Sequence, residues 1–191
     1  GTVYRDRGLS SDTSLTIDFA LDRAFEQAVT GAHLRPDAVR RVAIVGPGLD
    51  FTDKREGYDF YPPQTIQPFA VIDSLQRLGV PATGLEVVTL DLSPRVNQHL
   101  AEARERALAG QPYTLQLPLA ADWHGHQWQP DLVSYWNALG SRIGVAVDPI
   151  APPSAEVRTR AVRIRPEIAA TILPKPSIAG NKVSDAAIVI R

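Results

Sequence analysis

The chain of 191 residues carries 20 basic and 21 acidic side chains, and 44% of its residues are apolar. This is the composition of a folded globular domain, and a net charge of -1 argues against a general nucleic-acid or acidic-membrane binder. The absence of cysteine excludes disulfides, thiolate metal sites and cysteine nucleophiles, and no window holds the ~20 consecutive apolar residues of a membrane span.

The first part of the chain alternates between helical and strand patterns. Residues 1–32 are an N-terminal lead-in with a helix over 15–29, where apolar side chains recur at helical spacing. A short apolar run over residues 41–46 predicts a strand that is buried on both faces of a parallel sheet. After it we predict a loop over 49–67, a helix over 68–78, a strand over 85–90 and a helix over 93–108. This order predicts a right-handed βαβ unit over residues 41–110.

Residues 111–191 are expected to supply the rest of the sheet. We predict strands at 113–119, 157–165 and 185–190, a helix at 130–139, a short helix at 167–173, a connector at 145–155 and turns at 174–182. The whole chain is therefore expected to form one α/β domain, a Rossmann-like three-layer sandwich with a mostly parallel sheet. A sheet that ends at residue 190 would leave an edge for a second copy, so a homodimer is one candidate assembly.

The best candidate site lies where the first apolar strand meets Gly46, Pro47 and Gly48. Glycine has no side chain to block a ligand, and open α/β sheets bind ligands at the carboxyl ends of their strands. Asp91 ends the next predicted strand, where a carboxylate can accept both ribose hydroxyls of an adenosine group. From this pattern alone, nucleotide binding and a plain turn beside a helix-capping acid are equally supported.

The amino-acid sequences of these segments are more specific evidence than the order of strand, glycine turn and acid. Residues 42–48 (VAIVGPG), 87–94 (VVTLDLSP) and the following helix with AEARERA at 101–107 resemble the front half of a class I S-adenosylmethionine-dependent methyltransferase. The resemblance implies S-adenosylmethionine as the cofactor and methyl transfer to an acceptor that the sequence does not identify. It implies cofactor contacts by Gly46, Pro47, Gly48, Asp50, Asp91 and Leu92. The last apolar run, 184–190, resembles the family's fourth strand.

The chain departs from that family in three ways. No acid directly precedes Gly46, and the loop over 49–67 separates the glycine turn from its helix. The family fold has seven strands, which is more than we predict for this sequence. Two alternatives therefore stay open. One is a non-catalytic binding or scaffold domain, as a fragment or degenerate relative; the other is a different nucleotide-binding Rossmann domain. An NAD site is disfavoured because Asp91 lies far beyond the ~20 residues that usually separate glycines and acid.

Three weaker patterns complete the set of candidates. Tyr58, Phe60 and Tyr61, with Asp50 or Asp53, could form a lid over the cofactor, although anchoring of the loop is favoured. His124 and His126 could bind a metal with Asp122 or His99, but the ligand set is incomplete and we expect none. The arginine run is better explained by an edge strand than by nucleic acid; it comprises Arg158, Arg160, Arg163 and Arg165. A cytoplasmic location is favoured, with the periplasm as the alternative.

Overall fold

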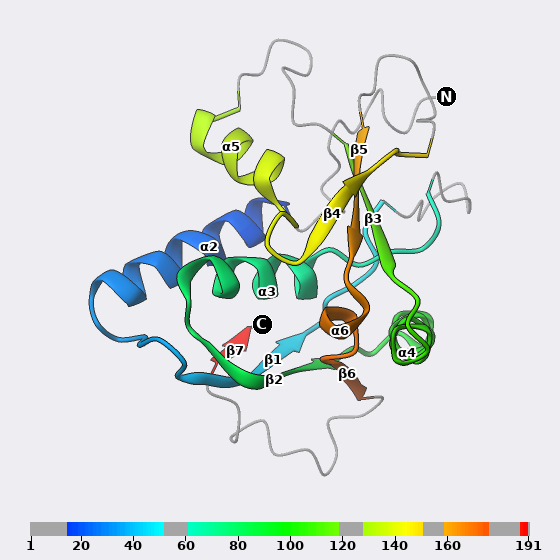
Figure 1. Cartoon of the computed structure of the whole chain (residues 1–191), viewed down its shortest axis with the longest axis horizontal. Coiled ribbons are helices and arrows are strands. Elements are labelled where there is room, and N and C mark those ends of the chain that lie inside the picture. The colour runs from blue at the N-terminus through cyan, green and yellow to red at the C-terminus, as the bar shows by residue number, and fades with distance from the viewer. Residues whose placement is uncertain (1–14, 52–60, 119–127, 151–158, 176–187, 191) are drawn as a thin grey trace.

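The computed structural model describes residues 15–51, 61–118, 128–150, 159–175 and 188–190. A parallel sheet of four strands, flanked by helices, lies below a separate antiparallel sheet of three strands (Figure 1). The expected α/β class is confirmed, and the parallel sheet has the arrangement of an incomplete Rossmann-like sandwich.

The parallel sheet has the strand order β6-β2-β1-β7. Its two inner strands, β1 (Val39–Val45) and β2 (Pro81–Leu90), are those expected from the apolar runs. The edge strands are β6 (Ile172–Lys175) and β7 (Ile188–Ile190), both parallel to their neighbours. The βαβ unit predicted over residues 41–110 therefore supplies the two central strands of the sheet. The last strand predicted in the chain, at 185–190, forms one edge.

Four of the longer predicted helices are confirmed. They are α2 (Leu15–Thr30), α3 (Gln67–Leu78), α4 (Pro94–Leu108) and α5 (Pro130–Ala138). Proline opens α4 and α5, where its missing N–H is no loss, and stands in the first turn of α3. Gly79 ends α3 with a left-handed φ of 68°, a conformation in which glycine carries no steric penalty.

The structure corrects three predictions in the second half of the chain. The short helix α6 (Pro166–Ala169) ends early, and residues expected as helix and turn form β6, where Ile172 pairs with Val87 of β2. Residues 144–147, partly assigned to a connector, form β4 (Gly144–Val147). The arginine-rich β5 (Thr159–Ile164) is the central strand of the antiparallel sheet rather than an edge strand.

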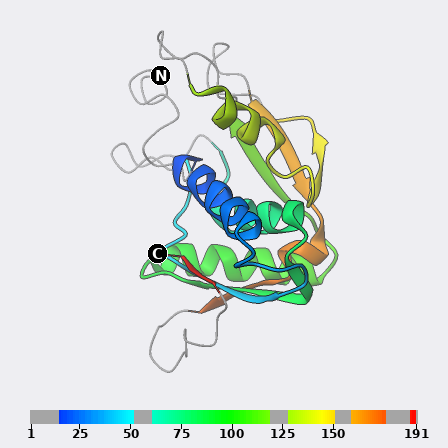
Figure 2. The same ribbon diagram turned by 90° about the vertical axis from the view of Figure 1, so that its left-hand side faces the viewer.

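The second half of the chain thus contributes strands to two sheets, whereas the sequence predicted that it would complete one. β3 (Tyr113–Pro118) and β4 both pair antiparallel with β5, whereas β6 and β7 return to the parallel sheet. In Figure 2 this second sheet stands apart from the parallel one, with α3 between them. Of the helices in the described segments, none combines the length and the apolar content needed to cross a membrane.

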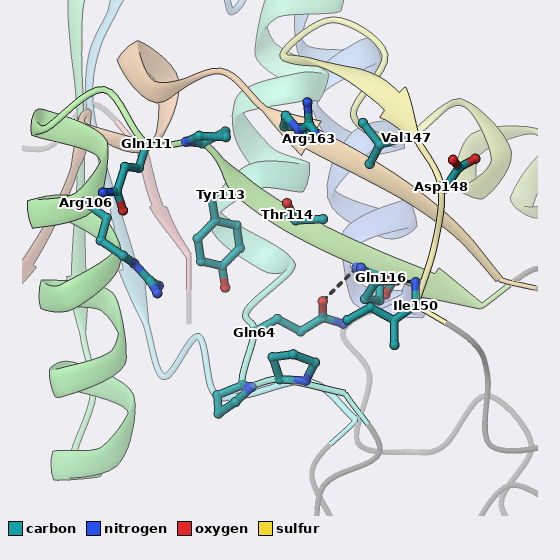
Figure 3. A pocket seen from close by; sticks show the side chains of 13 residues that line it. Gln64, Arg106, Gln111, Tyr113, Thr114, Gln116, Val147, Asp148, Ile150 and Arg163 are labelled. Atoms are coloured by element: carbon teal, nitrogen blue, oxygen red, sulfur yellow. Dashed lines mark hydrogen bonds between the residues drawn. The ribbon is translucent and has the colours of Figure 1, made fainter.

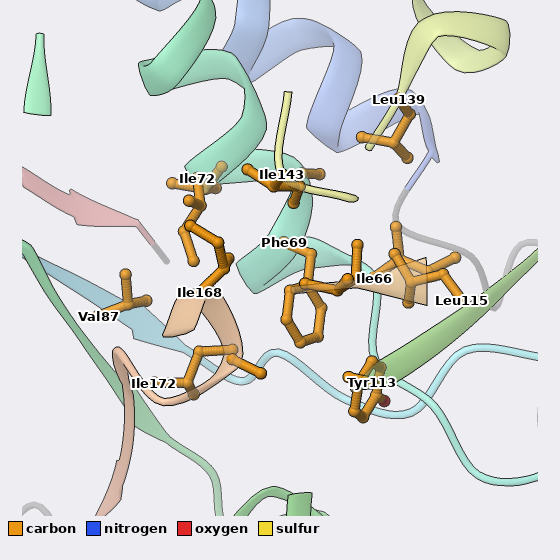
Figure 4. Close-up of a cluster of buried hydrophobic side chains, with 14 of the residues drawn as sticks. Ile66, Phe69, Ile72, Val87, Tyr113, Leu115, Leu139, Ile143, Ile168 and Ile172 are labelled. Atoms are coloured by element: carbon orange, nitrogen blue, oxygen red, sulfur yellow. The ribbon is translucent and has the colours of Figure 1, made fainter. Parts of the chain in front are cut away.

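Helix α3 is the centre of the hydrophobic core. Every residue from 67 to 75 is buried, which a helix on an outer face would not show. Figure 4 shows its Phe69 and Ile72 among side chains from both sheets, such as Val87 of β2 and Leu115 of β3. The ring of Phe69 stacks on that of Tyr113, with centroids 4.6 Å apart.

Candidate functional site

The glycine turn follows β1 directly at the carboxyl end of the parallel sheet. Gly46 and Gly48 have φ angles of 74° and 67°, a region that residues with a Cβ rarely adopt. The Gly46 N–H donates to the Leu90 carbonyl at 2.7 Å, which ties the turn to the end of β2. Among the described residues, none beyond the chain neighbours has an atom within 4 Å of a Cβ placed on either glycine. Pro47 between them is buried.

Asp91 lies opposite this turn, one residue after β2. Its Oδ2 accepts the Gly48 N–H at 3.2 Å, and its Oδ1 accepts the Ser93 N–H at 2.8 Å. The Asn97 side chain of α4 donates to the Asp91 main-chain carbonyl at 2.8 Å. The carboxylate is therefore fixed between the glycine turn and the start of α4, and the two sequence-predicted halves of the site come together.

This arrangement leaves Asp91 with acceptor capacity. An ionised carboxylate has about four lone-pair sites, and the two backbone donors use one on each oxygen. Asp91 is half-buried, so the remaining sites can accept hydroxyl groups from a ligand at the sheet edge. Beside it, the Leu92 side chain is 94% exposed, which leaves an apolar surface next to the acid.

Asp50 occupies a different environment from Asp91. Its side chain is buried, and Oδ2 accepts the Ile66 N–H at 2.6 Å, directly before α3. Its main-chain N–H donates to the Gln64 carbonyl at 2.8 Å. A carboxylate at a helix N-terminus is favoured by the helix dipole. Asp50 therefore holds the chain that enters α3, and its role toward a cofactor stays a prediction.

A polar pair of half-buried His99 on α4 and buried Tyr113 on β3 lies beside the segment before α3, and the sequence patterns did not point to it. The Tyr113 hydroxyl accepts the Thr65 N–H at 2.9 Å and lies 2.8 Å from Nε2 of His99. The Tyr113 hydroxyl can donate to Nε2 of a neutral imidazole that carries its proton on Nδ1, or accept from Nε2 of the other tautomer. Desolvation, with help from Arg106, lowers the pKa of His99 to about 4, and desolvation raises the pKa of Tyr113.

The lowered pKa of His99 predicts a pH-dependent stability. An unfolded chain protonates this imidazole near pH 6.5 and the folded chain only near pH 4, so the unfolded state binds more protons in between. Stability is then expected to fall as the pH falls from about 6.5 to about 4. In urea unfolding at stepped pH, His99→Gln should lose less stability over this interval than the wild type. Equal losses would contradict the assignment.

Of the other candidate residues, some lie in the described segments and others lie outside them. Tyr61 is buried, bonds the Thr159 hydroxyl at 2.8 Å and packs edge-on against Phe51, so it anchors its segment to β5. Arg160 is partly buried and donates to the main-chain carbonyls of Trp136 and Leu139. Several candidates lie outside the described residues: Asp53, Tyr58, Phe60, Asp122, His124, His126 and Arg158.

Two pockets are formed by described residues away from the glycine turn. One of about 430 Å³ lies between the last turn of α4 and the outer face of the antiparallel sheet (Figure 3). The other, of about 390 Å³, lies near the start of β2 and includes Gly79 and Thr171. Neither includes Gly46 or Asp91. Within the described segments, no cluster of three or more histidine, aspartate or glutamate side chains could hold a metal ion.

Comparison with known proteins adds no assignment to this geometry. No family model, curated protein or solved structure matches the chain.

Proposed function

We propose that the chain is an S-adenosylmethionine-dependent methyltransferase-like domain that binds its cofactor at the glycine turn and Asp91. The observation that carries the proposal is the Asp91 carboxylate, bonded to the Gly48 N–H at 3.2 Å at the carboxyl end of two adjacent parallel strands. Ligands of open α/β sheets bind at that edge. The resemblance of residues 41–110 to the family supports the same cofactor.

Each residue of the site has a distinct task in this proposal. The two ribose hydroxyls would donate to the remaining lone pairs of Asp91. The methionine part would pass over Gly46 and Gly48, where no side chain of the described residues intrudes. The exposed apolar side chain of Leu92 would pack against the adenine base of the cofactor. Methyl transfer needs an acceptor aligned with the sulfonium methyl and requires no covalent intermediate, so proximity supplies much of the rate. We assign no catalytic side chain.

A non-catalytic scaffold domain is the second candidate function. It is favoured by the hydrogen bonds that both acids already make to backbone N–H groups beside helices α3 and α4. Such bonds satisfy donors that a helix start leaves open, so they stabilise the fold without any ligand. In this alternative, Asp91 has the same structural role as Asp50 and the glycine turn only redirects the chain.

Calorimetric titration of the purified chain separates the two candidates. We expect S-adenosylmethionine and its demethylated product, S-adenosylhomocysteine, to bind with micromolar dissociation constants, while NAD gives no heat of binding. A chain that is folded by circular dichroism and binds none of the three supports the scaffold candidate. Binding of NAD alone would replace the methyltransferase proposal with a dinucleotide site.

A further inference from the structure

Strand β4 forms one edge of the antiparallel sheet. The described strands of this sheet have the order β3-β5-β4, and Figure 2 shows β4 at the outer margin of the molecule. Val145 is 58% exposed and Ala146 is exposed as well, although both side chains are apolar. β4 contains no proline and no charged residue, two features that commonly protect an edge strand from pairing with another chain. In the described part of the chain, this edge therefore presents main-chain groups and apolar side chains together.

The hydrogen-bond pattern of the sheet shows which main-chain groups of β4 point outward. The Arg165 N–H donates to the Ile143 carbonyl at 3.0 Å, one step before the first residue pair of the β4–β5 ladder. In an antiparallel ladder, opposite residues alternate between hydrogen-bonded and non-hydrogen-bonded pairs. Val145 therefore bonds to β5 through its main chain, whereas the N–H and C=O groups of Gly144 and Ala146 are directed away from β5.

Opposite charges flank β4 at equal distances from its exposed valine. Arg142 lies three residues before Val145 and Asp148 lies three residues after it, and both charged residues are exposed. Among the ion pairs of the described segments, none includes either side chain. A segment with this symmetric order of opposite charges is complementary to an antiparallel copy of itself.

We propose that β4 pairs antiparallel with β4 of a second copy of this chain, about a two-fold axis at Val145. In this register, Gly144 lies opposite Ala146 of the partner subunit, so the outward N–H and C=O groups of the two strands meet. The two Val145 side chains lie opposite each other, and Arg142 lies opposite Asp148 of the partner subunit at both ends. A shift by one residue would present main-chain groups that β5 already binds, and a shift by two would separate the opposite charges.

The proposed interface is not the one that the sequence suggested. The sequence pointed to the edge strand that ends at residue 190, which is β7 of the parallel sheet. Pairing through β4 instead joins two three-stranded antiparallel sheets into one sheet of six strands. Because β4 has only four residues, the contact is small and the dimer should form only at high protein concentration. The proposal goes beyond the methyltransferase proposal and does not depend on it.

Sedimentation velocity of the full chain, over about a hundredfold range of concentration in a low-salt buffer, measures this dimer. The wild type should change from monomer to dimer as its concentration rises. Val145→Lys should weaken the dimer about tenfold, because it places two ammonium groups opposite each other across the axis. The matched control is Val189→Lys, which makes the same change at a 41% exposed residue of β7 and should leave the dimer unchanged.

Charge reversal tests the register of the two strands. Arg142→Glu alone and Asp148→Arg alone should each weaken the dimer about tenfold, because two attractive pairs across the axis become repulsive. An equimolar mixture of these two variants should dimerise as the wild type does, since every pair in the mixed dimer again joins opposite charges. The proposal is overturned if the wild type stays monomeric over the whole range, or if Val189→Lys weakens the dimer as much as Val145→Lys. It is also overturned if the mixture stays monomeric while both variants keep the wild-type circular dichroism.

Discussion

Replacing Asp91 with asparagine is expected to weaken S-adenosylmethionine binding roughly hundredfold. The substitution keeps the size of the side chain but removes its charge and turns one acceptor oxygen into a donor. That donor would face the N–H of Gly48 or of Ser93, and it could no longer accept a ribose hydroxyl. One hydrogen bond to the ribose, worth about 1.5–3 kcal/mol when charge-assisted, is lost, and the other is weakened because the charge is gone. Calorimetric titration of wild type and variant measures the ratio directly.

Glu105→Gln is the matched control for this experiment. Glu105 is an exposed residue of α4, so its substitution removes the same charge without touching the sheet edge. We expect its affinity for the cofactor to equal that of the wild type. If Asp91→Asn binds as tightly as the wild type, the ribose role assigned to Asp91 is wrong. If Asp91→Asn loses binding only together with its folded circular dichroism, the acid has a structural role instead.

Replacing Trp136 with alanine is expected to lower the free energy of unfolding by about 3–5 kcal/mol. Trp136 is fully buried, and its indole N–H donates to the Pro118 carbonyl at the end of β3. The alanine variant leaves a large cavity and an unsatisfied carbonyl in the same place, and both effects lower stability. Urea unfolding followed by far-UV circular dichroism measures the change.

Two further variants separate the causes of that loss. Trp136→Phe keeps most of the ring volume but lacks the donor, so it should fall between the wild type and the alanine variant. Leu108→Ala changes an apolar side chain that is 61% exposed at the end of α4, and it should stay within about 0.5 kcal/mol of the wild type. A loss below about 1 kcal/mol for Trp136→Ala would show that this core region relaxes around the cavity.

The elements that the sequence predicted correctly are those with local signals. Helix α3 has a proline in its first turn and a glycine at its end, and β1 and β2 are apolar runs, so no distant contact is needed to recognise them. β6 has only four residues and becomes a strand because it pairs with β2, about eighty residues away in the chain. The antiparallel sheet likewise depends on pairing between β3 and β5, which no local pattern encodes.

The candidate site also combines residues that the sequence could predict with contacts that it could not. Gly46 and Asp91 each directly follow a strand, and Gly48 lies two residues after Gly46; parallel strands that pair bring their carboxyl ends to one edge, so the sequence could place these residues together. The contact between His99 and Tyr113, and the amide pair of Gln64 and Gln116, join residues whose separation gives no periodic signal. The environment of Asp50 was also beyond the sequence, because its partner Ile66 lies on the far side of a long loop.

Helix α3 lies between the two sheets and packs against both. Val87 and Ile172 of the parallel sheet, and Leu115 of the antiparallel sheet, belong to one hydrophobic cluster with Phe69 of this helix. Removing either sheet would therefore expose a face of α3 to water and deprive the other sheet of its shared inner layer. We therefore expect a single cooperative unfolding transition. A piece limited to residues 41–110 would carry the glycine turn and Asp91 but lack β6 and β7, the strands that flank β2 and β1 in the parallel sheet.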